Sequence, residues 1–181
     1  MFARSTSVPA VAKRHRQSGY TLMEILVSAL ILSIGLVGVA GVQALALVNN
    51  QSAYVRSQAT TMAYDLADRM RTNVEGANAG FYNPGAAATH ASCKTAVGCS
   101  TQQLAENDLA EWNAALTANL PMGTGFVCID STPDDGTGVG APACDGNGTQ
   151  FSIKIWWDGD RDGAISVAAD NLERMVINFQ L

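Results

Sequence analysis

An acidic residue at the start of a long apolar run is the first candidate for chemistry in this chain. Residues 25–42 contain no polar side chain except Ser28 and Ser33, and Glu24 directly precedes them. A helix of this length extends roughly 27 Å, close to the thickness of a bilayer's hydrocarbon core. A charge in such a segment costs about 2.5 kcal/mol or more at the centre and less near the headgroups. Glu24 therefore needs a positively charged partner.

The residues before Glu24 supply this partner if the chain is cut after Gly19. Cleavage there gives Tyr20 a free, positively charged amine, four residues from Glu24 and on the same face of a helix. The amine can meet its own Glu24 or the Glu24 of an adjacent subunit. In the uncut chain, residues 1–19 hold the amine away from the acid. The pattern indicates a switch, by cleavage, from stored membrane protein to assembly-ready subunit.

The charge distribution predicts which side of the membrane each part occupies. Four of the eleven basic residues lie in the leader, including Lys13, Arg14 and Arg16, and none of the sixteen acidic residues does. Basic residues just before a span stay on the cytoplasmic side, so we expect the body on the far side. The body keeps seven basic and sixteen acidic side chains, a net charge of −9. This balance argues against binding of nucleic acid, which needs Lys and Arg to replace phosphate counterions.

The hydropathy pattern divides the chain into three segments. We expect a basic leader over 1–19 that is cleaved, a long helix over 20–73 that spans the membrane at about 22–48, and a globular domain over 74–181. The alternative is an ordinary secretory signal with Ala44-Leu45-Ala46 as its cleavage site. Against this alternative, the apolar run is longer than the usual run of roughly 7–15 residues and begins with an acid.

The globular segment has the pattern of a small α+β domain. Met62, Leu66 and Met70 form an apolar stripe at helical spacing, which predicts that the second half of the long helix packs on the domain. Residues 74–100 are rich in small and polar residues and are expected to be a loop. A helix should follow from residue 100 or 101 to Pro121. Alternating apolar residues predict three antiparallel strands, over residues 125–129, 149–157 and 172–181.

Four cysteines, all in the globular segment, favour disulfides because their number is even and the expected compartment is oxidising. Three pairings are possible, and sequential pairing needs the shortest loops. Zinc binding is the rival interpretation, but the chain has no CxxC pair and only two histidines, His15 and His90. We therefore expect the bonds Cys93–Cys99 and Cys128–Cys144.

The N-terminal stretch also carries a family resemblance. A basic leader ending in Gly19, followed by Tyr20-Thr21-Leu22-Met23-Glu24 and an apolar helix, resembles the class III signal of type IV prepilins. Most of that family has Phe where this chain has Tyr20 and often Ile where it has Met23, and both replacements remain bulky. The later sequence is similar to the PilV-type minor pilins, known as type IV pilus modification proteins. The similar segments are residues 51–54, 56–59, 63–71, 104–112, 120–121 and 156–157.

The resemblance implies a pilin-like fold, a long N-terminal helix packed on a small antiparallel sheet with one extra helix, and a minor pilin function. A prepilin peptidase would cut between Gly19 and Tyr20 and methylate the Tyr20 amine, and Glu24 would pair with a partner's amine. The subunit would sit in the inner membrane as a single-pass protein with a periplasmic domain. It would then join other minor pilins and the major pilin in priming a pilus used for twitching motility or adhesion. Two alternatives are a type II secretion pseudopilin and a calcium-dependent binding module on a pilin anchor.

One further stretch has the composition of a cation site. Asp158, Asp160 and Asp162, with Gly163, spell DxDxDG, a spacing that suits calcium. However, Ala169 stands where an EF-hand has its bidentate Glu, and a strand is expected before the loop. Any calcium binding should therefore be weak, and a solvated turn is the alternative. We expect no other cofactor and no enzymatic activity, because the chain lacks a Gly-rich phosphate loop and a G-x-S-x-G motif.

Overall fold

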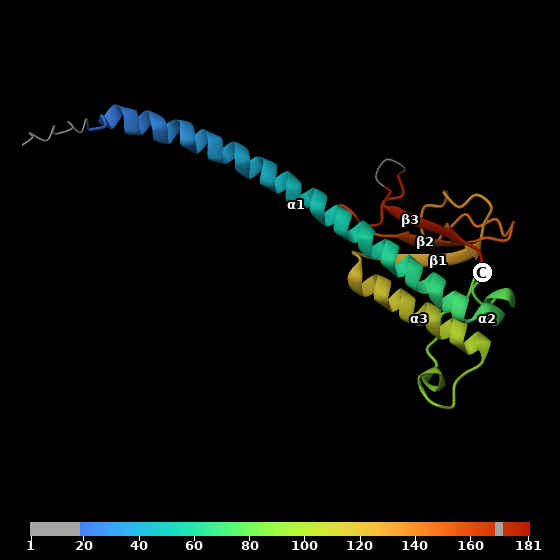
Figure 1. Ribbon diagram of the computed structural model, residues 1–181. Helices are drawn as coiled ribbons and strands as arrows, with labels where there is room; N and C mark the ends of the chain where they lie inside the picture. The colour runs from blue at the N-terminus through green and yellow to red at the C-terminus, as the bar shows by residue number, and fades with distance from the viewer. Residues whose placement is uncertain (1–18, 169–171) are drawn as a thin grey trace, which may run out of the picture. The chain divides into compact units, whose positions relative to one another are not determined.

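The computed structural model describes residues 19–168 and 172–181 (Figure 1). The leader, residues 1–18, and the end of the acidic loop, including Ala169, lie outside the described residues. The chain divides into two compact units, Met1–Ala46 and Leu47–Leu181. The elements in chain order are α1 (Leu22–Thr72), α2 (Val74–Asn78), the short 3-10 helix η1 (Ala91–Lys94), α3 (Thr101–Asn119), β1 (Thr124–Ile129), β2 (Phe151–Trp156) and β3 (Arg174–Phe179).

The first unit consists, in its described part, of the apolar first half of α1. Every side chain of this half is exposed, and it includes a stretch that is long and apolar enough to cross a membrane. A soluble helix hides one apolar stripe, whereas a helix that is apolar all round belongs in a hydrophobic surrounding. The described residues of this unit therefore leave its apolar surface uncovered.

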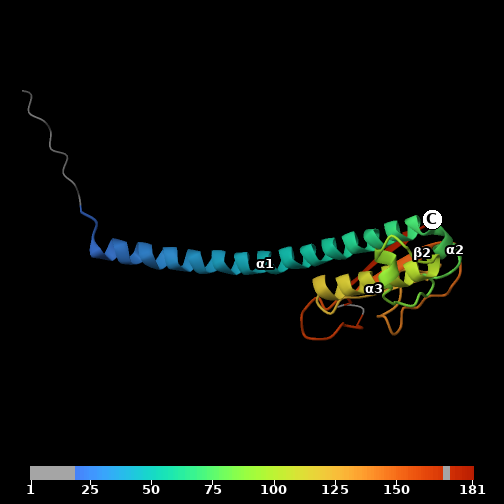
Figure 2. The same ribbon diagram turned by 90° about the horizontal axis from the view of Figure 1, so that it is seen from below.

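The second unit is built around the second half of α1. There α1 and α3 lie side by side against one face of the sheet (Figures 1 and 2). A row of small residues, Ala59, Ala63 and Ala67, is almost completely buried, together with Leu66 and Met70. Of the stripe that the sequence predicted, Leu66 and Met70 are thus buried, whereas Met62 is half-buried. Small side chains at intervals of four residues let the neighbouring elements approach α1 closely.

The helix α3 has a well-defined start and a buried anchor. The Ser100 hydroxyl accepts a hydrogen bond from the Gln103 N–H, and the Gln103 side chain accepts one from the Ser100 N–H, a reciprocal capping box. Trp112 is 1% exposed and donates its ring N–H to the Met62 carbonyl at 3.0 Å. This single bond satisfies the one polar atom of the largest side chain in the core and ties α3 to α1.

The three strands form an antiparallel sheet in the order β1-β2-β3. In the register, Lys154 of the central strand β2 faces Phe126 of β1 and Val176 of β3. The α+β fold expected from the sequence is confirmed. Alternation along β2 predicted that its polar side chains would face away from the core, but all six residues of β2 are buried, Ser152 and Lys154 included. Both faces of the central strand are covered, one by the helices and the other by the loop between β1 and β2.

The segment 74–100 is not the continuous loop expected from its composition. Asn73 accepts a hydrogen bond from the Gly76 N–H through its side chain and so caps the short helix α2. Further on, η1 begins at Ala91, and the bond between Cys93 and Cys99 closes its loop. A single capping side chain is enough to start a turn of helix where composition alone indicates a loop.

Candidate assembly site

The start of α1 positions the residues around the expected cleavage point. Gly19, Tyr20 and Thr21 are not helical, and the helix begins at Leu22. The Thr21 hydroxyl accepts a hydrogen bond from the Glu24 N–H at 3.3 Å, and the Thr21 carbonyl accepts another from the same group at 3.0 Å. These bonds satisfy a free donor of the first turn, so the helix is capped just after Tyr20.

The carboxylate of Glu24 is exposed on the first turn of α1. Among the described residues, no hydrogen bond or ion pair reaches its side-chain oxygens. Tyr20 and Glu24 line the same shallow pocket, together with Ser28 one turn further on. An acid in the first turn interacts favourably with the positive end of the helix dipole. The described chain supplies no full counter-charge, so the arrangement leaves room for a cation from outside it.

In the second unit, charges are paired across elements. Arg69 of α1 contacts Asp65 at 2.9 Å and also Glu111 of α3 at 2.9 Å. Lys94 of η1 lies 2.8 Å from Glu111 as well. Hydrogen bonds from Lys94, Arg69 and Asn107 lower the pKa of the Glu111 carboxyl to about 2. This carboxylate therefore links η1, α1 and α3.

Tyr82 belongs to a buried polar network with Asn73 and Asp108. Its hydroxyl donates to Asp108 at 2.6 Å and accepts from Asn73 at 3.2 Å, and the whole residue is buried. Burial, and then the hydrogen bond to Asp108, raise the pKa of the Tyr82 phenol above its usual range. A fully satisfied network of this kind fixes one arrangement of the loop after α1.

His90, for which the sequence suggested no acidic neighbour, has one in the structure. Its Nε2 lies 2.6 Å from Glu106 of α3, and its backbone N–H donates to Asn107. The contact lowers the pKa of the Glu106 carboxyl. The two residues are sixteen positions apart, so no local pattern could have paired them.

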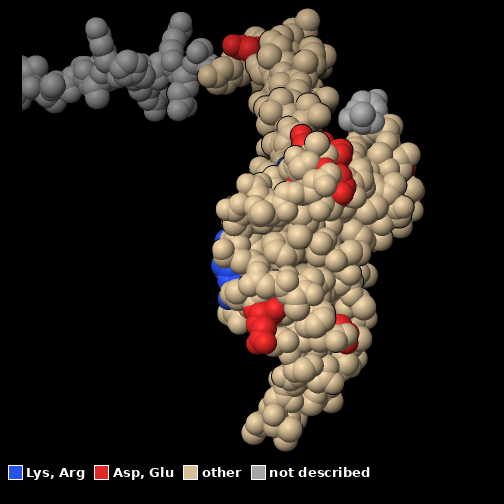
Figure 3. All heavy atoms as spheres, turned by 90° about the vertical axis from the view of Figure 1, so that its right-hand side faces the viewer, with Lys and Arg blue, Asp and Glu red and all other residues tan. Residues whose placement is uncertain are grey.

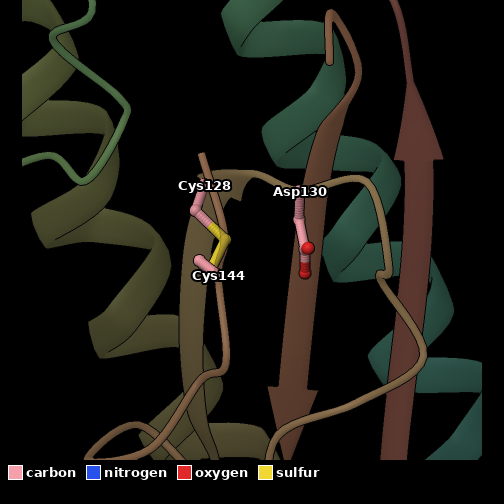
Figure 4. A group of neighbouring side chains, drawn as sticks. All are labelled: Cys128, Asp130 and Cys144. Carbon is pink, nitrogen blue, oxygen red and sulfur yellow. A yellow bond between two sulfur atoms is a disulfide. The ribbon is translucent and has the colours of Figure 1, made fainter. Parts of the chain in front are cut away.

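The loop between β1 and β2 covers a second buried charge cluster, of which Figure 4 labels Asp130. Cys128 and Cys144 close the loop with a disulfide, and the Asp130 side chain lies over β2. The Lys154 and Asp130 side chains are both fully buried, with Nζ 2.6 Å from Oδ2, and Nζ also lies 2.7 Å from Asp135. The hydrogen bond from Lys154 lowers the pKa of the Asp135 carboxyl. Sequence reasoning missed this cluster because alternation along β2 gives no sign that a loop covers the second face of the strand.

Sulfur and oxygen atoms of Cys128, Asp130 and Cys144 lie within 4.8 Å of one another, which would suit a metal ion by distance alone. The two sulfurs are bonded to each other, however, and only a thiolate binds a metal. The pairs Cys93–Cys99 and Cys128–Cys144 are those expected from sequential connectivity. The oxidised loop is therefore structural and is not a zinc site.

The acidic loop after β2 brings its three carboxylates together. Oxygens of Asp158, Asp160 and Asp162 lie within 4.8 Å of one another. Both oxygens of Asp158 already accept backbone N–H groups, from Arg161 at 2.7 Å and from Gly163 at 2.9 Å. Burial opposes ionisation, but these two donors hold the pKa of the Asp158 carboxyl below its usual range. The loop thus forms a satisfied turn whose exposed acids, Asp160 and Asp162, keep free oxygens for a cation.

The surface seen in Figure 3 is largely uncharged, with separate acidic clusters and one small basic area. Electrostatic capture of a polyanion needs a continuous basic stripe. This face offers none, in agreement with the acidic balance of the sequence.

Comparison with known protein families gives two adjoining matches. Residues 14–40 match the family described as the prokaryotic N-terminal methylation motif. Residues 41–110 match the family described as type IV pilin Tt1218. No curated protein and no solved structure matches the chain. The first match covers the expected cleavage point with Glu24, and the second covers the rest of α1 and most of α3.

Proposed function

We propose that this chain, a type IV pilin subunit with a prepilin-type methylation motif, is a minor pilin of the PilV type that primes pilus assembly. A prepilin peptidase cuts the bond between Gly19 and Tyr20 and methylates the new amine. The resemblance of residues 51–71 to PilV-type minor pilins supports the choice of a minor role. Type IV pilins are structural subunits, so the activity proposed is assembly and not catalysis.

The observation that carries the proposal is the free carboxylate of Glu24. It lies on an apolar, exposed helix, beside Tyr20, and has no charged partner among the described residues. A charge that enters an apolar fibre without a counter-ion is costly. The methylated amine of a neighbouring pilin supplies this counter-ion at the level of the first turn. The acid therefore selects cleaved neighbours, because an uncut neighbour keeps its amine nineteen residues away.

The subunit has two successive locations in this scheme. Before assembly, the apolar first half of α1 anchors it in the inner membrane, with residues 47–181 in the periplasm. After assembly, the same half lies among other pilin helices, which cover the apolar side chains that the chain itself leaves exposed. One apolar surface serves in both places because lipid and neighbouring helices are both hydrophobic.

The replacement Glu24→Ala tests the assignment of the charge pair. We expect the variant to be cut after Gly19 as the native chain is, and its amount in sheared fibres to fall at least about tenfold, equivalent to about 1.4 kcal/mol. Mass spectrometry of the first residue of the membrane form reports the cleavage, and immunoblotting of fibres reports incorporation. Ser28→Ala, a change on the same face one turn away, is the matched control and should incorporate normally.

Normal amounts of Glu24→Ala subunit in fibres would refute the role of the carboxylate. Deletion of the gene separates the minor pilin from the alternative pseudopilin of type II secretion. Loss of pili and twitching with intact protein secretion supports the proposal. Loss of secretion with normal pili contradicts it.

A further inference from the structure

The buried cluster on β2 has the parts of a condensation reaction. Lys154 Nζ, a primary amine, lies 2.6 Å from Oδ2 of Asp130, and both side chains are completely buried. Although the distance is that of a strong contact, Oδ2 has no hydrogen-bond partner among the described residues. The contact thus meets the distance of an ion pair without the alignment of a hydrogen bond.

The second oxygen of Asp130 is held as a carbonyl oxygen would be. The Thr132 N–H donates to Oδ1 at 3.0 Å, and the Thr132 hydroxyl lies 3.4 Å from the same atom. Donors aimed at an oxygen that gains negative charge during an attack stabilise the tetrahedral intermediate. Lys154, Asp130 and Thr132 are therefore arranged as nucleophile, electrophile and oxyanion donor.

A base for the amine proton is also present. Asp135 accepts a hydrogen bond from Lys154 Nζ at 2.7 Å, and its other oxygen contacts the Thr132 hydroxyl at 3.1 Å. The Asp135 side chain is 41% exposed, so it can exchange protons with water while the reacting pair stays dry. A carboxylate within hydrogen-bond reach of the proton is the geometric requirement for general base catalysis.

We propose that Lys154 and Asp130 are joined by an amide bond that the folded chain forms without an enzyme. The proton of the Lys154 ammonium passes to the Asp130 carboxylate, which gives a neutral amine and a neutral acid. The nitrogen attacks Cγ, Asp135 takes one proton from the nitrogen and returns it to the departing hydroxyl, and one water leaves. One C–N bond forms, one C–O bond breaks, and no oxidant or reductant is needed.

Burial favours the bond over the ion pair in two ways. Removal of both charges from water makes the ion pair costly, so the neutral pair that reacts becomes accessible. The water released leaves a site in which both reacting side chains are buried, which opposes the reverse hydrolysis. The link would fasten residue 130 to the middle of the central strand, within the loop that Cys128 and Cys144 already close. The loop would then be held by two covalent links of different chemistry, one of them insensitive to reductants.

The intact mass of the full chain tests the proposal. After purification from membranes in detergent and reduction of the disulfides, the native chain should weigh one water molecule less than its processed sequence. Trypsin should fail to cut after Lys154, so the fragment 95–154 should be replaced by 95–161, also lighter by one water. Lys154→Arg keeps the positive charge but has no primary amine, and its mass should match its sequence.

Two further variants keep the test decisive if Lys154→Arg fails to fold. Asp135→Ala removes the base at a partly exposed position and should raise the unlinked fraction at least about tenfold, the size of a typical loss of general base catalysis or less. Lys94→Arg changes a lysine in the exposed pair with Glu111 and should leave the loss of water unchanged. A folded native chain of full mass, cut by trypsin after Lys154, would overturn the proposal.

Discussion

In the first unit, Glu24 is exposed on a helix that is apolar on every side, and no described residue neutralises it. In the second unit, Asp130 is completely buried and lies 2.6 Å from the ammonium of Lys154. Both acids occupy surroundings that disfavour a charge. The difference is the source of the partner. The second unit supplies counter-ions for its buried acids, whereas the described residues of the first unit supply none for Glu24.

This contrast extends to the apolar side chains. The second unit covers its large residues, such as Trp112, between α1 and α3, while Leu30 in the first unit is 56% exposed. Burial of apolar side chains within the chain stabilises the folded domain. Burial of apolar side chains in lipid or among neighbouring helices holds the subunit in the membrane or in the fibre. The two halves of α1 are therefore selected for different properties, although they form one continuous helix in the secondary structure.

Truncation of one large side chain in each unit should show the contrast between the two units most strongly. Trp112→Ala should lower the free energy of unfolding of the second unit by about 3–5 kcal/mol, because it leaves a cavity in the core and removes the hydrogen bond to the Met62 carbonyl. Leu30→Ala should change it by less than about 0.5 kcal/mol. Urea unfolding of the full chain in detergent, followed by near-ultraviolet circular dichroism, measures both. Equal effects of the two changes on the free energy of unfolding would contradict the difference between the two units.

Acid should weaken the second unit through its paired carboxylates. The pKa of Glu111 is about 2 in the folded chain, below its ordinary value of 4.5, so the group binds a proton more readily when unfolded. Its contribution is present above about pH 4.5 and is lost as the pH falls toward 2. Because the side chain is 31% exposed, solvent screening reduces the contribution to about 1 kcal/mol.

Glu111→Gln should therefore flatten the dependence of unfolding free energy on pH in this window. The exposed acid Asp68, paired with Arg71 near the end of α1, offers the matched control Asp68→Asn. If the control flattened the curve as much as Glu111→Gln, the linkage among η1, α1 and α3 would not be its cause. Urea titrations at several pH values give the comparison.

The acidic loop should show the smallest effect. We propose that Asp158, Asp160 and Asp162 bind calcium only weakly, with dissociation at about millimolar concentration, because Asp158 already accepts two backbone hydrogen bonds. Calorimetric titration of the full chain in detergent measures this binding. Asp160→Asn should abolish the heat, with Asp68→Asn as the control. Absence of heat up to millimolar calcium would leave the loop as a turn, and tight binding would mean that the loop rearranges.

The sequence predicted the parts of this molecule that depend on local pattern. Spacing of Leu66 and Met70 indicated the buried stripe of α1, and alternation indicated the three strands within one to two residues at each end. The start of α3 was expected at residue 100 or 101, and the structure selects Ser100 as the cap, with Gln103 as its partner three residues later. In each case the deciding interaction joins residues that are close in the chain.

The missed features depend on partners that are far apart in the chain. Lys154 is buried because a loop that begins more than twenty residues earlier folds over β2. The alternation of polar and apolar residues along the strand does not indicate that loop. His90 contacts Glu106 of α3 across the segment that contains η1. The need of Glu24 for a counter-ion was inferred from hydropathy, because an isolated charge in an apolar run is a local pattern, and it stays a prediction.

The buried face of α1 carries a row of side chains that each consist of one methyl group, those of Ala59, Ala63 and Ala67. Substitutions in this row can make the side chains larger but hardly smaller. Added methylenes in a close-packed core typically cost about 1–3 kcal/mol, whereas the opposite face of the same helix meets no such limit. The permitted variation of this helix is therefore one-sided: bulk can change on the outer surface, but along the row it can increase only where a facing residue becomes smaller.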